Sequence, residues 1–116
     1  MLSTDQDRLP SVQDAFFAPG NEASVWVDGW WPCAAAAQAL ATRRTPTEEW
    51  WHAGTAPVLV VQGMQDRLAP PGNACALQED LGDRVTLVEV EGAGHALLPE
   101  QPEAVATAVK SFFEAH

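Results

Sequence analysis

The sequence predicts an α/β fold, a short parallel β-α-β-α unit preceded by a Trp-rich segment that is mainly helical or irregular. Two apolar, β-branched runs at residues 57–62 and 85–90 carry this prediction, together with helix-forming stretches after each. Continuous apolar runs are typical of parallel strands that are covered on both faces. The roughly twenty residues between the two runs suffice for the right-handed crossover that joins parallel strands.

The first half of the chain, residues 1–55, shows no clear strand. An apolar stretch at residues 15–18 ends at the strong turn-forming residues 19–21. The Ala-rich run from Pro32 to Arg44 predicts a helix, because Ala has the highest helix propensity and Pro suits the first turn. A second short helix is expected over residues 45–51, where Thr45 is a plausible N-cap.

Four of the five tryptophans form two adjacent pairs, Trp30-Trp31 and Trp50-Trp51. Such side chains line ligand pockets in some proteins, but paired Trp in a short helical segment more often anchors a small core. We therefore expect core anchoring, with exposure to solvent or to a partner as the alternative.

The second half is patterned more clearly. The first strand, Pro57 to Gln62, ends at Gly63, and the next helix is expected over Pro71 to Leu81, with Gly82 as its C-terminal stop. The second strand follows over Val85 to Val90. The last helix is expected from Pro102 to about Ala115, and its apolar positions recur at helical spacing and predict one buried stripe: Val105, Ala108, Val109, Phe112 and Phe113.

The formal charge of −10, from 16 acidic and 6 basic residues, disfavours binding to nucleic acid and to anionic membrane surfaces. Cys33 and Cys75 fit no metal or redox spacing, so two free, buried thiols in a reducing cytoplasm are expected, with a disulfide between them as the alternative. Neither a signal-peptide pattern at the N-terminus nor a run long enough to span a bilayer is found, and the default expectation is a cytoplasmic protein. No metal or cofactor is expected.

Two polar residues follow the ends of the two predicted strands. Asp66 comes shortly after the first strand and His95 after the second, and the carboxyl ends of parallel strands lie at one edge of a sheet. An Asp that accepts a hydrogen bond from one imidazole nitrogen leaves the other nitrogen free to act as a general base. Taken singly, Asp66 is more often a turn former or helix cap, so the joint placement predicts a catalytic pair.

Residues 56–66, 88–95 and 100–103 resemble the closing segment of α/β-hydrolase fold enzymes. The resemblance implies that Asp66 is the acid and His95 the histidine of a catalytic triad. It also implies a single partial α/β-hydrolase domain over residues 1–116, with a lid-proximal segment at 1–55 and the C-terminal βαβα unit at 56–116.

One departure from that family concerns the nucleophile. The family carries it in a turn of the type G-x-S-x-G upstream of the acid, and none of Ser3, Ser11, Ser24 and Ser111 lies in such a turn. We therefore expect the C-terminal portion of a serine-type hydrolase, inactive alone, whose full-length parent cleaves an ester-like or related bond in a small-molecule substrate.

Two alternatives stay open. The chain is one part of a split hydrolase, or it is a non-catalytic module that binds a ligand or self-associates on a hydrolase scaffold. Either implies a partner chain or a second copy along the exposed sheet edge at residues 58–61. A two-stranded parallel sheet is unusual by itself, so the isolated chain is expected to be marginally stable or oligomeric.

Overall fold

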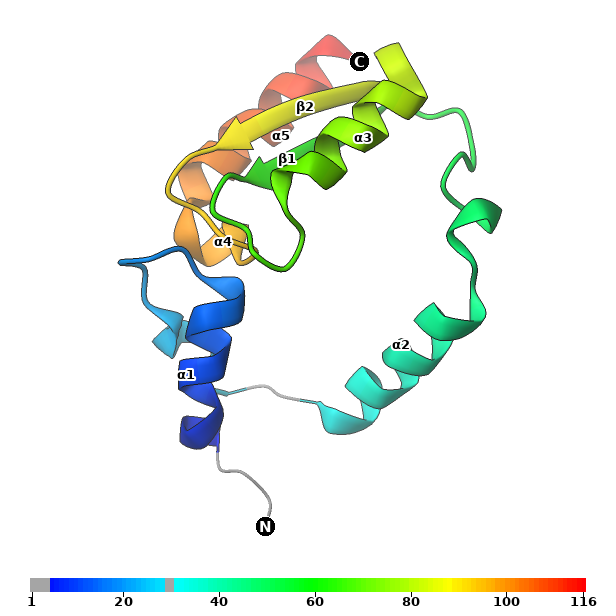
Figure 1. Cartoon of the computed structure of the whole chain (residues 1–116). Coiled ribbons are helices and arrows are strands. Elements are labelled where there is room, and N and C mark those ends of the chain that lie inside the picture. Colours follow the sequence, from blue (N-terminus) through cyan, green and yellow to red (C-terminus); the bar gives the residue numbers. More distant parts are fainter. Residues whose placement is uncertain (1–4, 29–30) are drawn as a thin grey trace.

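A computed structural model of the chain describes residues 5–28 and 31–116 (Figure 1). Trp30, expected to anchor a core, and Ser3, excluded as the nucleophile, lie outside the described residues. The regular elements, in chain order, are α1 (Asp5–Phe16), α2 (Pro32–Arg44), β1 (Val58–Gly63), α3 (Pro71–Leu81), β2 (Val85–Val90), α4 (Leu97–Glu100) and α5 (Pro102–Ala115). Three short 3₁₀ turns lie between them, at Ala23–Trp26, Thr47–Glu49 and Gly82–Arg84.

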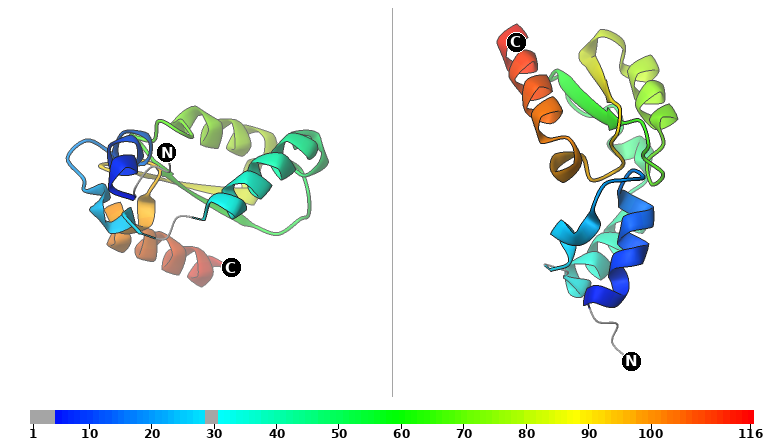
Figure 2. Two further views of the ribbon diagram at one scale, coloured as in Figure 1. Left: turned by 90° about the horizontal axis from the view of Figure 1, so that it is seen from below. Right: turned by 90° about the vertical axis from the view of Figure 1, so that its left-hand side faces the viewer.

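The two strands form a parallel sheet in the predicted order. Val58 lies opposite Val85 and Gly63 opposite Val90, so both strands end at the same edge. Helix α3 covers one face of the sheet and α5 the other (Figures 1 and 2). The predicted β-α-β-α unit is therefore confirmed.

The last helix has the predicted bounds, but its apolar stripe is only partly buried. Ala108 is 8% exposed, whereas Val109 is 39% and Phe113 is 73% exposed. The prediction of one buried stripe was wrong for these two side chains. A sheet of two strands is too narrow to cover the whole apolar face that helical periodicity identifies.

The N-terminal helix α1 was not predicted. Its residues show weak amphipathic patterning, and Pro10 lies inside it. The helix is held instead by tertiary contacts, because Val12, Phe17 and Ala23 form a small core with Ala96 from the other half of the chain. The side chain of Gln13 adds two hydrogen bonds to the segment that follows the helix, to the carbonyl of residue 21 and the N–H of residue 23.

Helix α2 has the predicted bounds but packs against almost nothing. Every residue from 31 to 50 is exposed, including Trp31 at 76% and Trp50 at 51%. Core anchoring was therefore the wrong prediction for these tryptophans, and exposure, the alternative, holds. Cys33 and Cys75 are free thiols as expected, but both are exposed rather than buried. Each lies on a helical face that no described element covers, because the sheet is narrow and α2 is unpacked.

The chain is more extended than a compact domain of its length. The radius of gyration is 16.1 Å, against about 13 Å for a compact chain of this length. The accessible surface is 8196 Å², where a compact monomer of this mass has about 6,100 Å². The exposed large apolar side chains include Trp31, Leu40 and Trp50 in the Trp-rich segment and Val109 and Phe113 on α5. None of the helices in the described parts of the chain is long and apolar enough to cross a membrane.

Candidate active site

Asp66 lies in the turn that follows β1, and its carboxylate is almost fully buried. One carboxylate oxygen, Oδ1, accepts hydrogen bonds from the backbone N–H groups of Leu68 at 2.9 Å and Ala69 at 2.8 Å. The whole residue is only 8% exposed. Two backbone donors fix the orientation of the carboxylate and leave its second oxygen, Oδ2, pointing elsewhere.

That second oxygen meets the imidazole of His95. The distance between Asp66 Oδ2 and His95 Nδ1 is 2.9 Å. The His95 side chain is 39% exposed, while that of Asp66 is 6% exposed. The predicted pair is therefore in direct contact, with the carboxylate inside and the imidazole at the surface.

The loops that carry the two residues are joined by backbone and side-chain hydrogen bonds. The N–H of Met64 donates to the carbonyl of Val90 at 3.0 Å, so the strand pairing continues past the end of β1. The N–H of Gln65 donates to the carbonyl of Ala93, and Gln65 Oε1 accepts from the N–H groups of Gly92 and Ala93. Gln65, for which the sequence predicted no role, therefore fixes the loop that carries His95, residues 91–95, which we call the histidine loop.

Helix α1 forms one wall of the site. The ring of Phe16 lies edge-on to the His95 imidazole, with 5.6 Å between ring centroids. The N–H of Ala96 donates to the carbonyl of Phe16 at 2.9 Å. Sequence reasoning missed this contact, because 79 positions separate Phe16 from His95 and no local pattern connects them.

The geometry defines what this pair can do. With Nδ1 facing a carboxylate, the neutral ring holds its proton on Nδ1 and presents the lone pair of Nε2. Such a nitrogen can accept a proton from a hydroxyl or thiol. Among the described residues, no hydrogen bond joins His95 to a Ser, Thr or Cys side chain. The geometry therefore suits a general base with an orienting carboxylate, and among the described residues no nucleophile is hydrogen-bonded to the imidazole.

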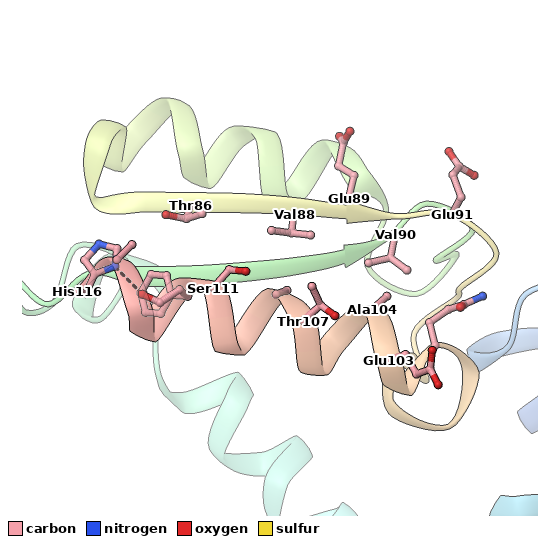
Figure 3. A pocket seen from close by; sticks show the side chains of 14 residues that line it. Thr86, Val88, Glu89, Val90, Glu91, Glu103, Ala104, Thr107, Ser111 and His116 are labelled. Atoms are coloured by element: carbon pink, nitrogen blue, oxygen red, sulfur yellow. Dashed lines mark hydrogen bonds between the residues drawn. The ribbon is translucent and has the colours of Figure 1, made fainter.

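A groove of about 700 Å³ lies elsewhere (Figure 3). It runs between β2 and α5, and neither Asp66 nor His95 lines it. Ser111 and His116 do, but His116 Nδ1 is hydrogen-bonded to the carbonyl of Phe112 in its own helix, 2.9 Å away. Among the described residues that line the groove, no hydrogen bond joins Ser111 to His116. In residues 5–28 and 31–116, no three His, Cys, Asp or Glu side chains gather in a metal-binding cluster.

Two parallel strands that end at one edge, with a helix on each face, fit the closing part of an α/β-hydrolase fold. The sequence profile of an α/β-hydrolase family matches residues 22–115, so the chain belongs to the α/β-hydrolases. More narrowly, the matching profile is that of the TAP-like proteins.

Among solved structures, the chain is similar to a membrane phospholipase A described as a bacterial virulence factor. The TM-score is 0.67 and the sequence identity 22%, which shows a shared fold. The match covers 97% of this chain and 39% of the phospholipase, so the chain spans about two fifths of that protein's length. No curated protein matches the sequence.

Proposed function

We propose that this chain provides the acid, Asp66, and the histidine, His95, of a serine-type hydrolase site whose nucleophile comes from polypeptide outside this sequence. The observation that carries the proposal is the 2.9 Å contact between a buried, doubly anchored carboxylate and a half-exposed imidazole. Membership of the α/β-hydrolase family supports it, because that family uses a nucleophile, an acid and a histidine in this chain order.

In the proposed mechanism, Nε2 of His95 removes the proton from the nucleophile's hydroxyl as that oxygen attacks the carbonyl carbon of an ester-like bond. The Asp66 carboxylate stabilises the imidazolium that forms and keeps the ring oriented. His95 then donates the proton to the leaving group, and a second cycle with water releases the acid product. In this proposal the chain provides the groups that transfer the proton, whereas the other polypeptide provides the nucleophile and the N–H groups that stabilise the oxyanion.

The exposed surfaces support association with that other polypeptide. Among the described strands β1 pairs only with β2, so its outer edge presents unpaired backbone groups to another strand. The surface exceeds that of a compact monomer by about 2,000 Å², and a standard interface buries about 800 Å² per partner. The edge of β1 and the exposed helix α2 therefore offer enough area for the remaining strands of a hydrolase sheet, either from the same parent chain or from a separate one.

A complementation experiment tests this proposal. The chain is mixed with the N-terminal portion of a TAP-like hydrolase that ends before the segment matching residue 22 and carries a G-x-S-x-G turn. We expect no hydrolysis of an aryl ester by either part alone and measurable hydrolysis by the mixture. His95→Asn should abolish it, and Asp66→Asn should lower kcat by about 10⁴-fold, because the wrong tautomer is then favoured.

The matched control is His52→Asn, since His52 is exposed and lies outside the two loops that carry the pair. This variant should hydrolyse the ester as the unmodified chain does. If mixtures containing His95→Asn and His52→Asn hydrolysed the ester equally well, His95 would have no catalytic role. A split enzyme and a shortened gene product are then distinguished by the coding DNA upstream: an in-frame or frameshifted G-x-S-x-G segment favours the latter.

A second candidate function is a non-catalytic module that self-associates. The exposure of Trp31, Leu40 and Trp50 within one segment favours it, because extended exposed apolar surface is typical of interaction sites. It predicts a stable dimer in light scattering whose formation is unaffected by Asp66→Ala and His95→Ala. A monomer that complements the hydrolase portion would instead support the catalytic proposal.

A further inference from the structure

Glu100, the last residue of α4, is hydrogen-bonded to two other segments around the site, the loop before His95 and the segment after α1. Its Oε2 accepts a hydrogen bond from the N–H of Gly94 at 2.7 Å. Its Oε1 accepts from the N–H of Ala18 at 2.6 Å and from Nδ2 of Asn21 at 2.8 Å. One partly buried carboxylate thus holds the residue before His95 and, through its other oxygen, the segment that follows α1.

We propose that Glu100 is a positioning residue for His95, and that it locks the histidine loop onto the segment after α1 so that the imidazole meets Asp66. This inference rests on the Asp66–His95 pair of the proposed function and concerns how the pair is held. Glu100 touches neither the imidazole nor the reacting atoms, and it acts through the backbone at Gly94.

The chemistry of the three donors explains why a carboxylate is needed. Two oxygens receive three N–H donors, at distances of 2.6–2.8 Å that are typical of charge-assisted hydrogen bonds. A Gln at this position would keep the size of the side chain but replace one acceptor oxygen by an NH₂ donor. One of the two loops would then face a donor instead of an acceptor.

The packing around Gly94 supports the same conclusion independently. A Cβ at this position would lie 2.7 Å from the carbonyl oxygen of Phe16 and 2.9 Å from the nitrogen of Ala18. The two loops therefore touch at the level of their backbones. Gln65 holds the loop that carries His95 through the N–H groups of Gly92 and Ala93, and Glu100 holds it through the N–H of Gly94.

The experiment compares Glu100→Gln with Glu103→Gln in the full chain. Glu103 is exposed and lies three residues further on, so its variant makes the same chemical change outside the contact network. Imidazole ¹⁵N shifts measured by NMR report the tautomer of each histidine, and exposed His52 is the internal reference. Amide hydrogen exchange reports the Gly94 contact in the same samples.

In the unmodified chain we expect His95 to be mainly in the Nδ1–H form. Glu100→Gln should lower the population of that form by about twofold or more, because the ring no longer stays opposite its carboxylate. Exchange of the Gly94 amide should accelerate by about tenfold or more, the effect of losing a hydrogen bond to a charged group. Glu103→Gln should change neither observable.

Two results would overturn the positioning role. An unchanged His95 tautomer with faster Gly94 exchange would show a structural contact only, and no change in either would show that the contact is absent. If Glu100→Gln loses its helical circular dichroism, the variant is unfolded and Asn21→Ala is used for the test instead. Asn21→Ala removes one donor to Glu100 and should also lower the population of the Nδ1–H form of His95. The proposed function fails separately if Asp66→Asn leaves the His95 tautomer unaltered.

Discussion

Gly94→Ala is a substitution for which the structure predicts a large loss of stability. The new Cβ would approach the carbonyl oxygen of Phe16 to 2.7 Å, the nitrogen of Ala18 to 2.9 Å and the carbonyl carbon of Phe17 to 3.0 Å. All three are backbone atoms, which a side-chain rotation cannot move away. Gly94 is not among the glycines with positive φ, so the constraint is space and not backbone conformation.

The cost has two parts. Forcing a methyl group into a closely packed site costs about 1–3 kcal/mol. The loop shift that relieves the clash also weakens the 2.7 Å hydrogen bond from the Gly94 N–H to Glu100, and a bond to a charged group contributes about 1.5–3 kcal/mol. We expect Gly94→Ala to lower the free energy of unfolding by about 2–5 kcal/mol, a large fraction of the total for a small domain.

Gly72→Ala is the matched control. Gly72 lies in helix α3, and a Cβ there would meet no atom within 4 Å. The same substitution should stabilise the chain by about 0.4–1 kcal/mol, because Ala restricts the unfolded state and fits helical backbone. Urea titrations followed by tryptophan fluorescence measure both variants. A Gly94→Ala midpoint equal to that of the unmodified chain would refute the packing argument.

Three further predictions follow from the described contacts. Asp66→Ala should destabilise the chain by about 2–4 kcal/mol in urea titration, because the N–H groups of Leu68 and Ala69 lose their acceptor, and Asp66→Asn should cost clearly less; equal costs would contradict this. Both Cys33 and Cys75 should react with a thiol reagent in the native chain, and a need for denaturant would contradict their exposure. The isolated chain should also elute at a concentration-dependent size in gel filtration with light scattering, because its edge and Trp-rich segment are uncovered; a constant monomer mass would argue against association.

The strands and three of the helices follow from local patterns. Residues 58–63 and 85–90 pair as their continuous apolar, β-branched sequences indicate, and Gly82, with φ of 57°, stops α3 where the sequence predicts. The Ala-rich segment forms α2 as its propensity indicates, although nothing packs on it. These outcomes depend on propensity, periodicity and turn chemistry, which are properties of neighbouring residues.

Other features of the structure could not be predicted from local sequence patterns, because they depend on contacts between distant parts of the chain. Helix α1 shows only weak amphipathic patterning, and its packing partner Ala96 lies more than 75 positions away. The exposure of Phe113 depends on how many strands lie beneath α5, which helical spacing does not encode. The short helix α4 and the role of Glu100 in bridging two loops carry no local signal either.

The sequence by itself determined that Asp66 and His95 follow two consecutive parallel strands and so lie at the same edge of the sheet. It could do so because strands and their order are encoded by short stretches of neighbouring residues. Only the tertiary structure decided that Asp66 is buried and His95 half exposed, and which backbone groups hold each in place. Those properties arise where segments far apart in the chain come into contact. Burial and hydrogen bonding between such segments are set by the packing of the whole fold and not by any short stretch of residues.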